Sequence, residues 1–349
     1  MPHAGDSVLL GLSGGVDSSV CAWLLKRGGR DVVAVTLRFC DTPATREKTA
    51  HAAQTCEQLG IEHHVIDARE RFAAAVERPF AAAAAAGDGA NPCVGCTAQL
   101  KVPLLLEAAR EHGCARVATG HYAAVTADEG RSLLSWQLRC PKDKSKDQSF
   151  LLYALEQEQL AQLEFPLANR TKPSVRQLAM RAGLQRLSPL HDGQGTPCFF
   201  GDGDGAAWLE GAGALEPAAG EVVSLAGGAK LGRHDGLHRY ACGQRWGEGL
   251  YVVGKDVREN VLVVAPHVLA GAERVLLSDV FWTSIEPPQR KRSCRVRTAY
   301  DATPHPAQLV PTADGLLVNF TRPLVGLYPG QLLVFYSDDL VLGGGHIAC

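Results

Sequence analysis

Near the start of the chain stands the stretch Ser13-Gly14-Gly15-Val16-Asp17-Ser18-Ser19. It directly follows an apolar run and opens a segment with helical spacing that ends at Gly28-Gly29. Small residues at such a turn let backbone N–H groups approach a phosphate closely, and the helix N-terminus adds donors and partial positive charge. The stretch lacks the Lys of a P-loop kinase and the G-x-G-x-x-G of dinucleotide binders. It therefore predicts a different kind of phosphate-binding turn, the alternative being an ordinary corner between strand and helix.

Strand and helix patterns alternate through the first third of the chain. Strands are expected at 7–12, 31–37, 62–66 and 115–119, and helices at 17–27, 45–59, 69–86 and 99–112. This alternation predicts the α/β class, with a parallel sheet covered by helices on both faces. Ligands of such sheets bind at the carboxyl ends of the strands, where the Ser13–Ser19 stretch lies.

The pattern changes after about Gly201. Residues 201–205 (Gly-Asp-Gly-Asp-Gly) are expected to be a flexible connector. Short strands follow at 221–225, 250–253 and 261–265, and from about Arg274 nearly all of the pattern is strand, as in a small β-barrel. We therefore expect three domains: residues 1–203 with the phosphate-binding turn, a small central domain at 204–268, and a C-terminal β-barrel at 269–349.

Composition narrows the class of protein. The 349 residues carry a net charge of −2 and are 46% hydrophobic, which excludes disorder and a surface coated with basic charge. The N-terminus lacks the pattern of a signal peptide, and no apolar run approaches the roughly 18 residues of a membrane span, so a cytoplasmic protein is expected. Eleven cysteines fit a disulfide framework badly in such a protein. Most of them, Cys40 among them, are expected to be small buried hydrophobes.

Two cysteine segments stand out as candidates for chemistry. Asn91-Pro92-Cys93-Val94-Gly95-Cys96 leads into a predicted helix, and Cys198 lies in Thr196-Pro197-Cys198-Phe199. A thiol at a helix N-terminus has a lowered pKa, which favours the nucleophilic thiolate. A structural zinc site would need a second pair of ligands, and no second C-x-x-C is present. A thioredoxin-like redox pair is a further alternative, although the context of the motif differs.

The order of motifs resembles a known family. The Ser13–Ser19 turn resembles the PP-loop of ATP pyrophosphatases. The remaining motifs are Asn91-Pro92-x-x-x-Cys96, Ala118-Thr119-Gly120-His121-Tyr122, Lys146-Asp147-Gln148-Ser149, Cys198-Phe199, Gly243-Gln244-Arg245 and Leu342-Gly343-Gly344-Gly345. Together they resemble the tRNA-specific 2-thiouridylase family over essentially the whole chain. The resemblance implies a PP-loop domain, a central domain and a barrel similar to that of elongation factors.

The resemblance also implies an activity, the 2-thiolation of the wobble uridine of tRNA. ATP with Mg²⁺ would adenylate O2 of the base, Cys198 would carry sulfur as a persulfide received from a donor protein, and Cys96 would act as the nucleophile that resolves it. The residues expected to bind ATP are Gly11, Leu12, Ser13, Gly14, Gly15, Val16, Asp17, Ser18, Leu37 and Gly120. Those expected to contact tRNA are Asn91, Pro92, Cys93, His121, Lys146, Asp147, Gln148, Ala299, Tyr300 and Gln331.

Basic segments agree with an RNA substrate despite the negative net charge. Lys142, Lys144 and Lys146 lie close together, and so do the arginines and lysine of 290–297. We expect these side chains to contact phosphates, the alternative being a solvated charged face.

Two departures from the family pattern leave alternatives open. Cys93 stands where the family often has Asp, and residues 191–197 before Cys198 are atypical. Three thiolates, from Cys93, Cys96 and Cys198, would suit a [4Fe–4S] cluster with one open iron, so a cluster mechanism is an alternative to the persulfide. Two other functions also stay open. One is a PP-loop synthetase acting on a small molecule, and the other is a tRNA-binding or sulfur-carrier module with an inactive nucleotide site.

Overall fold

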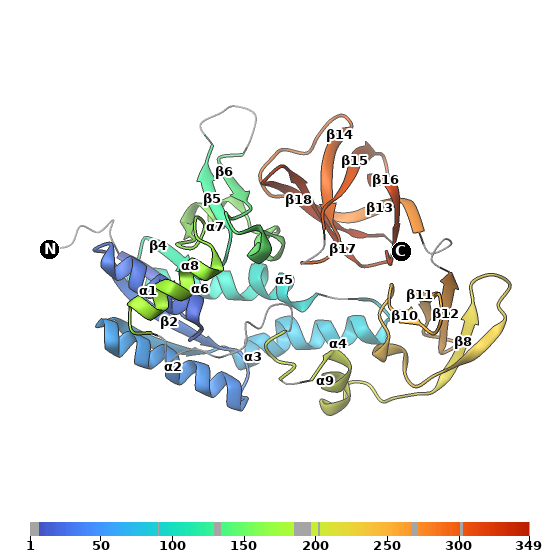
Figure 1. Ribbon diagram of the computed structural model, residues 1–349, viewed down its shortest axis with the longest axis horizontal. Helices are drawn as coiled ribbons and strands as arrows, with labels where there is room; N and C mark the ends of the chain where they lie inside the picture. The colour runs from blue at the N-terminus through green and yellow to red at the C-terminus, as the bar shows by residue number, and fades with distance from the viewer. Residues whose placement is uncertain are drawn as a thin grey trace.

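The computed structural model describes residues 7–89, 91–128, 134–184, 197–201, 203–266, 271–300 and 303–348. Its strands form three sheets, an N-terminal parallel sheet, a central sheet and a C-terminal barrel (Figure 1). Within these ranges, no helix is both long and apolar enough to cross a bilayer.

The N-terminal sheet is parallel throughout. From edge to edge its strands are β3 (Glu62–Asp67), β2 (Asp31–Arg38), β1 (Ser7–Gly11), β4 (Arg116–Thr119) and β7 (Leu163–Glu164). The predicted strands are thus confirmed nearly residue for residue, and β7 is an addition.

Helices cover both faces of this sheet, as predicted. Helices α1 (Val16–Arg27), α2 (Pro43–Leu59) and α8 (Lys172–Arg181) pack on one face, where Val8 and Leu10 of β1 are buried. Helix α6 (Val102–Glu111) packs on the other face, against Leu9. Successive residues of β1 therefore enter two different cores, which is the reason for its continuous apolar run.

The two longer helices predicted after β3 are interrupted. The first, predicted at 69–86, consists of α3 (Arg69–Phe72), the π-helical turn η1 (Ala73–Glu77) and α4 (Arg78–Ala85). The second, predicted at 99–112, begins earlier than expected, because the segment taken for a loop before it forms α5 (Pro92–Cys96), which is followed by the π-helical turn η2 (Thr97–Lys101) and α6. In each case a proline, Pro79 or Pro103, follows the π turn. Proline has no N–H and clashes with the carbonyl four residues before it, and the wider π turn accommodates both effects.

Further short elements lead from β4 to α8. They are β5 (Ala124–Ala127), β6 (Trp136–Arg139), the 3₁₀ turns η3 (Lys144–Lys146) and η4 (Ser149–Leu152), and α7 (Gln157–Gln162).

The central sheet is preceded by a helix that the sequence analysis did not predict. Its strands are β10 (Arg245–Trp246), β11 (Leu250–Asp256), β12 (Val261–Pro266), β8 (Gly220–Ser224) and β9 (Lys230–His234), and the 3₁₀ turn η6 spans Leu237–Arg239. The expected connector at 201–205 is corrected here, since Gly205 already begins α9 (Gly205–Gly211). Asp204 caps this helix by accepting a hydrogen bond from the backbone N–H of Ala207 at 2.9 Å.

The C-terminal barrel closes with six strands. They are β13 (Gly271–Trp282), β16 (Gly315–Val325), β15 (His305–Thr312), β14 (Arg292–Arg297), β17 (Leu332–Ser337) and β18 (Leu340–Ile347). Pairing of β13 with β18 closes the barrel. Strand β6 then extends the sheet, because its Arg139 pairs with Leu340 of β18. A hairpin of the N-terminal part, β5 with β6, thereby extends the barrel sheet.

A buried ion pair also joins the barrel to the N-terminal part. Arg297 of β14 pairs with Asp147 at 2.8 Å, and its guanidinium lies 4.7 Å from the centre of the Tyr336 ring. Arg297 is only 9% exposed. The expectation that Arg297 contacts phosphates is therefore corrected: it holds the barrel against the N-terminal part.

Candidate functional site

A cavity of about 360 Å³ lies at the carboxyl ends of β1, β2 and β4. Its lining joins the glycine-rich turn to residues from distant segments. The lining residues are Gly11, Leu12, Ser13, Asp17, Ser18, Val35, Thr36, Leu37, Arg38, Phe39, Cys40, Thr45, Lys48, Thr49, Lys101, Leu105, Thr119, Gly120, His121, Gln148 and Cys198. Seven of the ten residues expected to bind ATP are in this lining, and Gly14, Gly15 and Val16 form the turn behind them.

The turn needs its glycines for physical reasons. Gly14 has φ +76°, and a Cβ there would lie 1.9 Å from the backbone oxygen of Lys48. Ser18 braces the turn, because its Oγ accepts a hydrogen bond from Ser13 N at 3.2 Å and donates one to the Gly15 carbonyl at 3.0 Å. A Cβ on Gly120 would lie 3.0 Å from Ser18 N, so glycine there allows the end of β4 to approach the start of α1 without displacing it. The result is a tight backbone cradle at a helix N-terminus, which suits phosphate oxygens.

Asp17 is held by two side chains that the sequence analysis missed. Its carboxylate accepts a hydrogen bond from the Tyr122 hydroxyl at 2.9 Å and pairs with Lys172 Nζ at 2.7 Å. The Lys172 side chain is only 7% exposed. Burial and the nearby Asp17 carboxylate raise the pKa of Tyr122, which keeps it a hydrogen-bond donor. Lys172 lies 155 residues from Asp17 in the chain, so no local pattern signals the pair.

Two thiols line the cavity, Cys198 and Cys40. The Cys40 Sγ donates a hydrogen bond to the Cys198 carbonyl oxygen at 3.7 Å. The hydrogen bond between the thiols, helped by the charges of Lys101 and Lys48, lowers the pKa of Cys198 to about 7, and the pKa of Cys40 is raised. Cys40 is thus not merely the buried hydrophobe expected. The missed signal is its position just beyond the carboxyl end of β2, the edge of the sheet where ligands bind.

Aromatic packing fixes the segment that carries Cys198. The ring of Phe199 is 5% exposed and lies 5.5 Å from the Phe72 ring, 5.8 Å from that of Phe80 and 4.8 Å from that of Trp208, between centroids. The same core contains Cys40 at its border. Of the atypical segment before Cys198, residues 191–196 lie outside the described residues.

The other two candidate cysteines lie on α5. Asn91 caps this helix by accepting a hydrogen bond from Cys93 N at 3.1 Å. Cys96 is 6% exposed within the aromatic core, and burial raises its pKa to about 11. Burial also raises the pKa of Cys93, and Cys198 acts electrostatically on both thiols. Neither residue is in the cavity lining, although Cys96 belongs to the same aromatic core as Phe199, the neighbour of Cys198 in the chain.

The residues expected to contact tRNA are spread over several places. His121 and Gln148 line the cavity, and burial lowers the pKa of His121 to about 3, so its ring is neutral. Asp147 is 4% exposed and paired with Arg297, which leaves it no free surface for RNA.

The remaining candidates lie at the start of α5, in η3, and in or beside the barrel. Asn91 and Ala299 are exposed, whereas Pro92, Lys146, Tyr300 and Gln331 are half-buried. Gln331 Nε2 donates to the Thr298 carbonyl at 3.3 Å. The loop before Asn91 touches the barrel turn, since a Cβ on Gly89 would lie 2.4 Å from the Tyr328 ring. Asn91 and Gln331 therefore belong to neighbouring segments of the surface.

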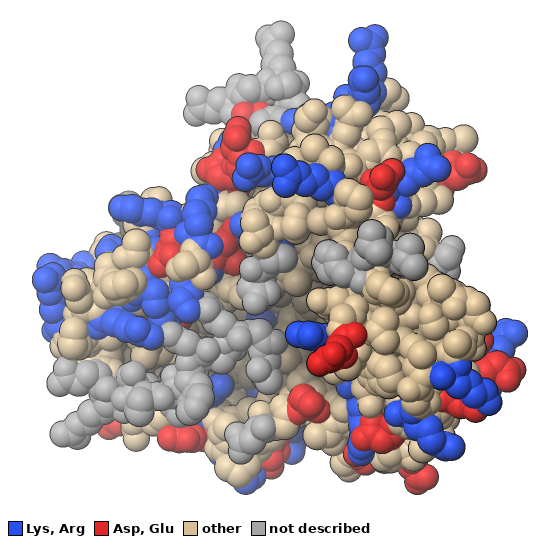
Figure 2. All heavy atoms as spheres, turned by 45° about the vertical axis from the view of Figure 1, so that its right-hand side comes forward, with Lys and Arg blue, Asp and Glu red and all other residues tan. Residues whose placement is uncertain are grey.

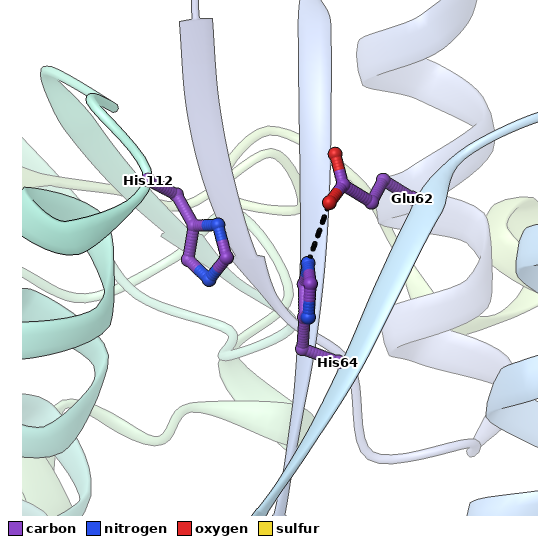
Figure 3. Close-up of side chains that lie close together, drawn as sticks. All are labelled: Glu62, His64 and His112. Carbon is purple, nitrogen blue, oxygen red and sulfur yellow. Dashed lines mark hydrogen bonds and ion pairs between the residues drawn. The ribbon is translucent and has the colours of Figure 1, made fainter.

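Outside the cavity, one group among the described residues could offer three metal ligands. Glu62, His64 and His112 have donor atoms within 4.8 Å of one another (Figure 3). His64 Nε2 lies 2.8 Å from Glu62 Oε1, and the ring centroids of His64 and His112 lie 4.3 Å apart. Glu62 begins β3, which places the group at the end of the sheet opposite the cavity.

The lowered pKa of Cys198 predicts a distinctive reactivity. Its alkylation by iodoacetamide should reach half of its maximal rate near pH 7. The reason is that only the thiolate reacts, and the thiolate becomes protonated as the pH falls below the pKa. Cys40→Ala should move this midpoint upward, because the thiol that donates to Cys198 is gone. Peptide mass spectrometry across pH measures both.

Cys242→Ala, in the central part of the chain, is the matched control and should leave the midpoint in place. A wild-type midpoint as high as that of an ordinary thiol, about 8.5, would contradict the geometry.

Comparison with known proteins gives matches along the whole chain. Three families match in order: "tRNA methyl transferase HUP domain" at 6–202, "tRNA methyl transferase PRC-barrel domain" at 212–266, and "Aminomethyltransferase beta-barrel domain" at 272–347. The tRNA-specific 2-thiouridylase MnmA of Geobacter metallireducens is 37% identical over 363 residues, covering 97% of this chain and 96% of that protein. The protein of the same name from Pelobacter propionicus is 38% identical over 354 residues, with 97% of both chains covered.

A solved structure is similar at a greater distance. The U34-tRNA thiolase NcsA from Methanococcus maripaludis, with its [4Fe–4S] cluster, is 21% identical over 51% of this chain and 57% of that chain, with a TM-score of 0.35. This likeness is too distant to bear on the site.

Proposed function

The chain belongs to the tRNA-specific 2-thiouridylase family, and we propose that it catalyses the ATP-dependent 2-thiolation of the wobble uridine of tRNA. One observation carries this proposal: a phosphate-binding turn and a thiol of lowered pKa, Cys198, line the same cavity. A base in this cavity would meet both an activating nucleotide and a sulfur nucleophile. We place this reaction in the cytoplasm, which holds pools of both tRNA and ATP.

ATP binds in this proposal with its phosphates on the turn after β1 and its adenosine near Leu37 and Gly120. Backbone donors at the start of α1 stabilise the phosphate charge. The Asp17 carboxylate and the hydroxyls of Ser13 and Ser18 line the cavity, and oxygen donors of this kind suit Mg²⁺. A bound Mg²⁺ would neutralise phosphate charge beside these three residues. Attack of the uridine O2 on the α-phosphate then gives an adenylated base and pyrophosphate.

Sulfur reaches the base through Cys198. Its thiolate accepts a sulfane sulfur from a persulfide donor, and the terminal sulfur attacks C2 while AMP leaves. Near neutral pH a pKa of about 7 keeps a large share of this thiol in the reactive form. His121, neutral and half-buried at the cavity wall, contributes a polar contact without a charge.

The tRNA must bring an unstacked base to the cavity. We propose contacts from Asn91, Pro92 and Cys93 on one side, from His121 and Gln148 at the cavity with Lys146 nearby in the chain, and from Ala299, Tyr300 and Gln331 on the barrel side. Asp147 acts through its pair with Arg297, by holding the barrel in place. Figure 2 shows Lys and Arg side chains gathered at the left and the top of one face that is hollowed in its middle.

The exposed basic residues predict the salt dependence of binding. Lys142, Lys144, Arg290, Lys291 and Arg295 are exposed. Lys142→Gln with Lys144→Gln should weaken tRNA binding and reduce the slope of log affinity against log salt by about one unit per lost phosphate contact. Filter binding across a salt series measures this slope. Arg258→Gln, an exposed change in the central part, should leave the slope as it is. Equal slopes for both variants would mean that the lysines are only solvated.

The position of three cysteines favours a second mechanism, in which an iron–sulfur cluster takes part. Cys198 acts electrostatically on Cys93 and Cys96, and three thiolates are the donor type of iron–sulfur clusters. These three residues would hold a [4Fe–4S] cluster, whose open iron would bind a sulfide. Anaerobic purification with iron and sulfide counts tests this alternative.

The function itself is tested by mass spectrometry of nucleosides. Unmodified tRNA incubated with protein, ATP and a persulfide donor should contain 2-thiouridine at the wobble position, and formation of AMP should depend on tRNA. Formation of AMP without tRNA would favour a synthetase that acts on a small molecule. Binding of tRNA without formation of AMP would indicate a carrier with an inactive nucleotide site.

A further inference from the structure

We propose that Glu62, His64 and His112 form a zinc site that ties the edge strand β3 to the end of α6, at the end of the sheet opposite the nucleotide cavity. The inference goes beyond the proposed function and does not depend on it. Imidazole nitrogens and carboxylate oxygens are ligands that zinc takes in proteins. Two histidines and one glutamate, with water in the fourth position, hold zinc in several enzymes.

The three side chains converge from two elements of the fold. Glu62 and His64 stand two residues apart on β3, so they share one face of the strand. His112 is the C-cap residue of α6. His64 contacts both of the others, because its Nε2 lies 2.8 Å from Glu62 Oε1 and its ring centroid lies 4.3 Å from that of His112 (Figure 3). The packing of α6 against the sheet therefore brings the three ligands together.

The spacing of the donor atoms suits a zinc ion after small side-chain rotations. The donor atoms of the three residues lie within 4.8 Å of one another. Two ligand atoms at about 2 Å from a tetrahedral zinc lie roughly 3.3 Å apart, which is within this range. The Glu62–His64 pair is closer because it shares a hydrogen bond, and its proton leaves Nε2 when the metal binds. Both side chains can rotate, since that of His64 is 37% exposed and that of Glu62 is 65% exposed.

The electrostatic surroundings favour a cation at this place. Helix α6 ends at Glu111, so the negative end of its dipole lies at His112. Burial raises the pKa of the Cys114 thiol, and the carboxylates of Asp31 and Glu62 raise it further. Negative charge from two strands and a helix end therefore meets at the group, and it offsets the charge of the bound ion.

A metal here would stabilise the edge of the sheet. Among the described strands, β3 pairs with β2 alone, so one of its edges makes no ladder. Zinc would give β3 a second attachment, to the end of the helix that packs on the sheet. Because such a site forms only in the folded chain, zinc at about 100 times its Kd should raise the Tm by roughly 5 °C or more.

The first arm of the test identifies the ligands with cobalt, which replaces zinc and reports its ligands by absorption. Wild type, His64→Gln, His112→Gln and His51→Gln are freed of metal, titrated with Co²⁺ and then with Zn²⁺ in competition. The bands that His64→Gln and His112→Gln lose relative to the wild type should be weak visible bands without the charge-transfer band of a thiolate. Their affinity for Zn²⁺ at this site should fall by more than the roughly tenfold that loss of a mere neighbour of a ligand costs.

His51→Gln is the matched control. His51 Nε2 lies 4.0 Å from Glu47 Oε1, and this pair belongs to no three-ligand group among the described residues. The variant should bind both metals like the wild type. Identical titrations for all four proteins, or a lost band with thiolate character, would overturn the inference, because the metal would then lie on the cysteines or elsewhere.

The second arm measures thermal unfolding with and without Zn²⁺. The wild type and His51→Gln should show the full rise in Tm, and the two ligand variants should lose most of it. Glu62→Gln, a change at an exposed side chain, should lose it as well and serves where a histidine variant folds poorly. An equal rise in Tm for the wild type and all three ligand variants would contradict the site. Neither arm contains tRNA or ATP, so failure of the zinc site leaves the proposed function standing, and the reverse also holds.

Discussion

Cys198→Ala is expected to lower the rate of tRNA thiolation by roughly 10³-fold or more, because it removes the atom that carries the sulfur. Formation of AMP in the presence of tRNA should persist, since the phosphate turn and Gly120 are untouched. The side chain is exposed, so the fold should tolerate the change. Nucleoside mass spectrometry and release of labelled AMP, measured on the same samples, separate the two steps.

The control for this variant is Cys294→Ala, a buried thiol in the barrel far from the cavity. It should thiolate tRNA like the wild type. Undiminished thiolation by Cys198→Ala would rule out Cys198 as the sulfur carrier. Loss of AMP formation together with thiolation would instead make Cys198 a binding residue for the base or the nucleotide.

Asp17→Asn is expected to affect both activity and stability. The change removes the charge that Lys172 contacts at 2.7 Å in a largely buried position. Breaking such a pair from one side costs about 3 kcal/mol of unfolding free energy. Because Asp17 also lines the cavity beside the phosphate turn, formation of AMP should fall by roughly 10²-fold or more. Urea unfolding and an AMP assay with folded protein measure the two effects separately.

Two further variants show where the effect of Asp17 comes from. Tyr122→Phe removes only the hydrogen bond of 2.9 Å and should cost about 1 kcal/mol with little loss of AMP formation. Glu221→Gln breaks an exposed pair with Lys230 and should cost less than about 1 kcal/mol. An Asp17→Asn protein that is as stable and as active as the wild type would show that the Asp17–Lys172 pair is incidental.

Several parts of the fold were predictable because their causes are local. Each strand of the N-terminal sheet except β7 is preceded or followed by turn residues that mark its ends, and apolar periodicity identifies α1 and α2. The interruption of the helices at Pro79 and Pro103 was not predicted, although proline itself was the available signal. The β5–β6 hairpin that joins the barrel sheet carries no such signal, because its partner β18 lies two hundred residues further on.

The functional site likewise has a part that is predictable from the sequence and a part that is not. The phosphate turn could be identified from Ser13–Ser19 alone, because its glycines and the helix that follows form the cradle with their own backbone. Cys93, Cys96 and Cys198 could be identified as candidate thiols from the sequence, whereas Cys40 was expected to be only a small buried hydrophobe. Whether Cys40 or Cys96 faces Cys198 depends on how the end of β2, the start of α5 and the Phe199 segment pack around one aromatic core.

The sequence by itself therefore determined the strand–turn–helix that we propose binds phosphate, the parallel sheet and the residue types that are candidates for chemistry. Only the tertiary structure decided which of these residues meet. Cys40 and Cys198 are separated by 158 residues, and Asp17 and Lys172 by 155. The pKa of a thiol and the strength of an ion pair depend on neighbours in space and on burial, and chain folding brings those neighbours together.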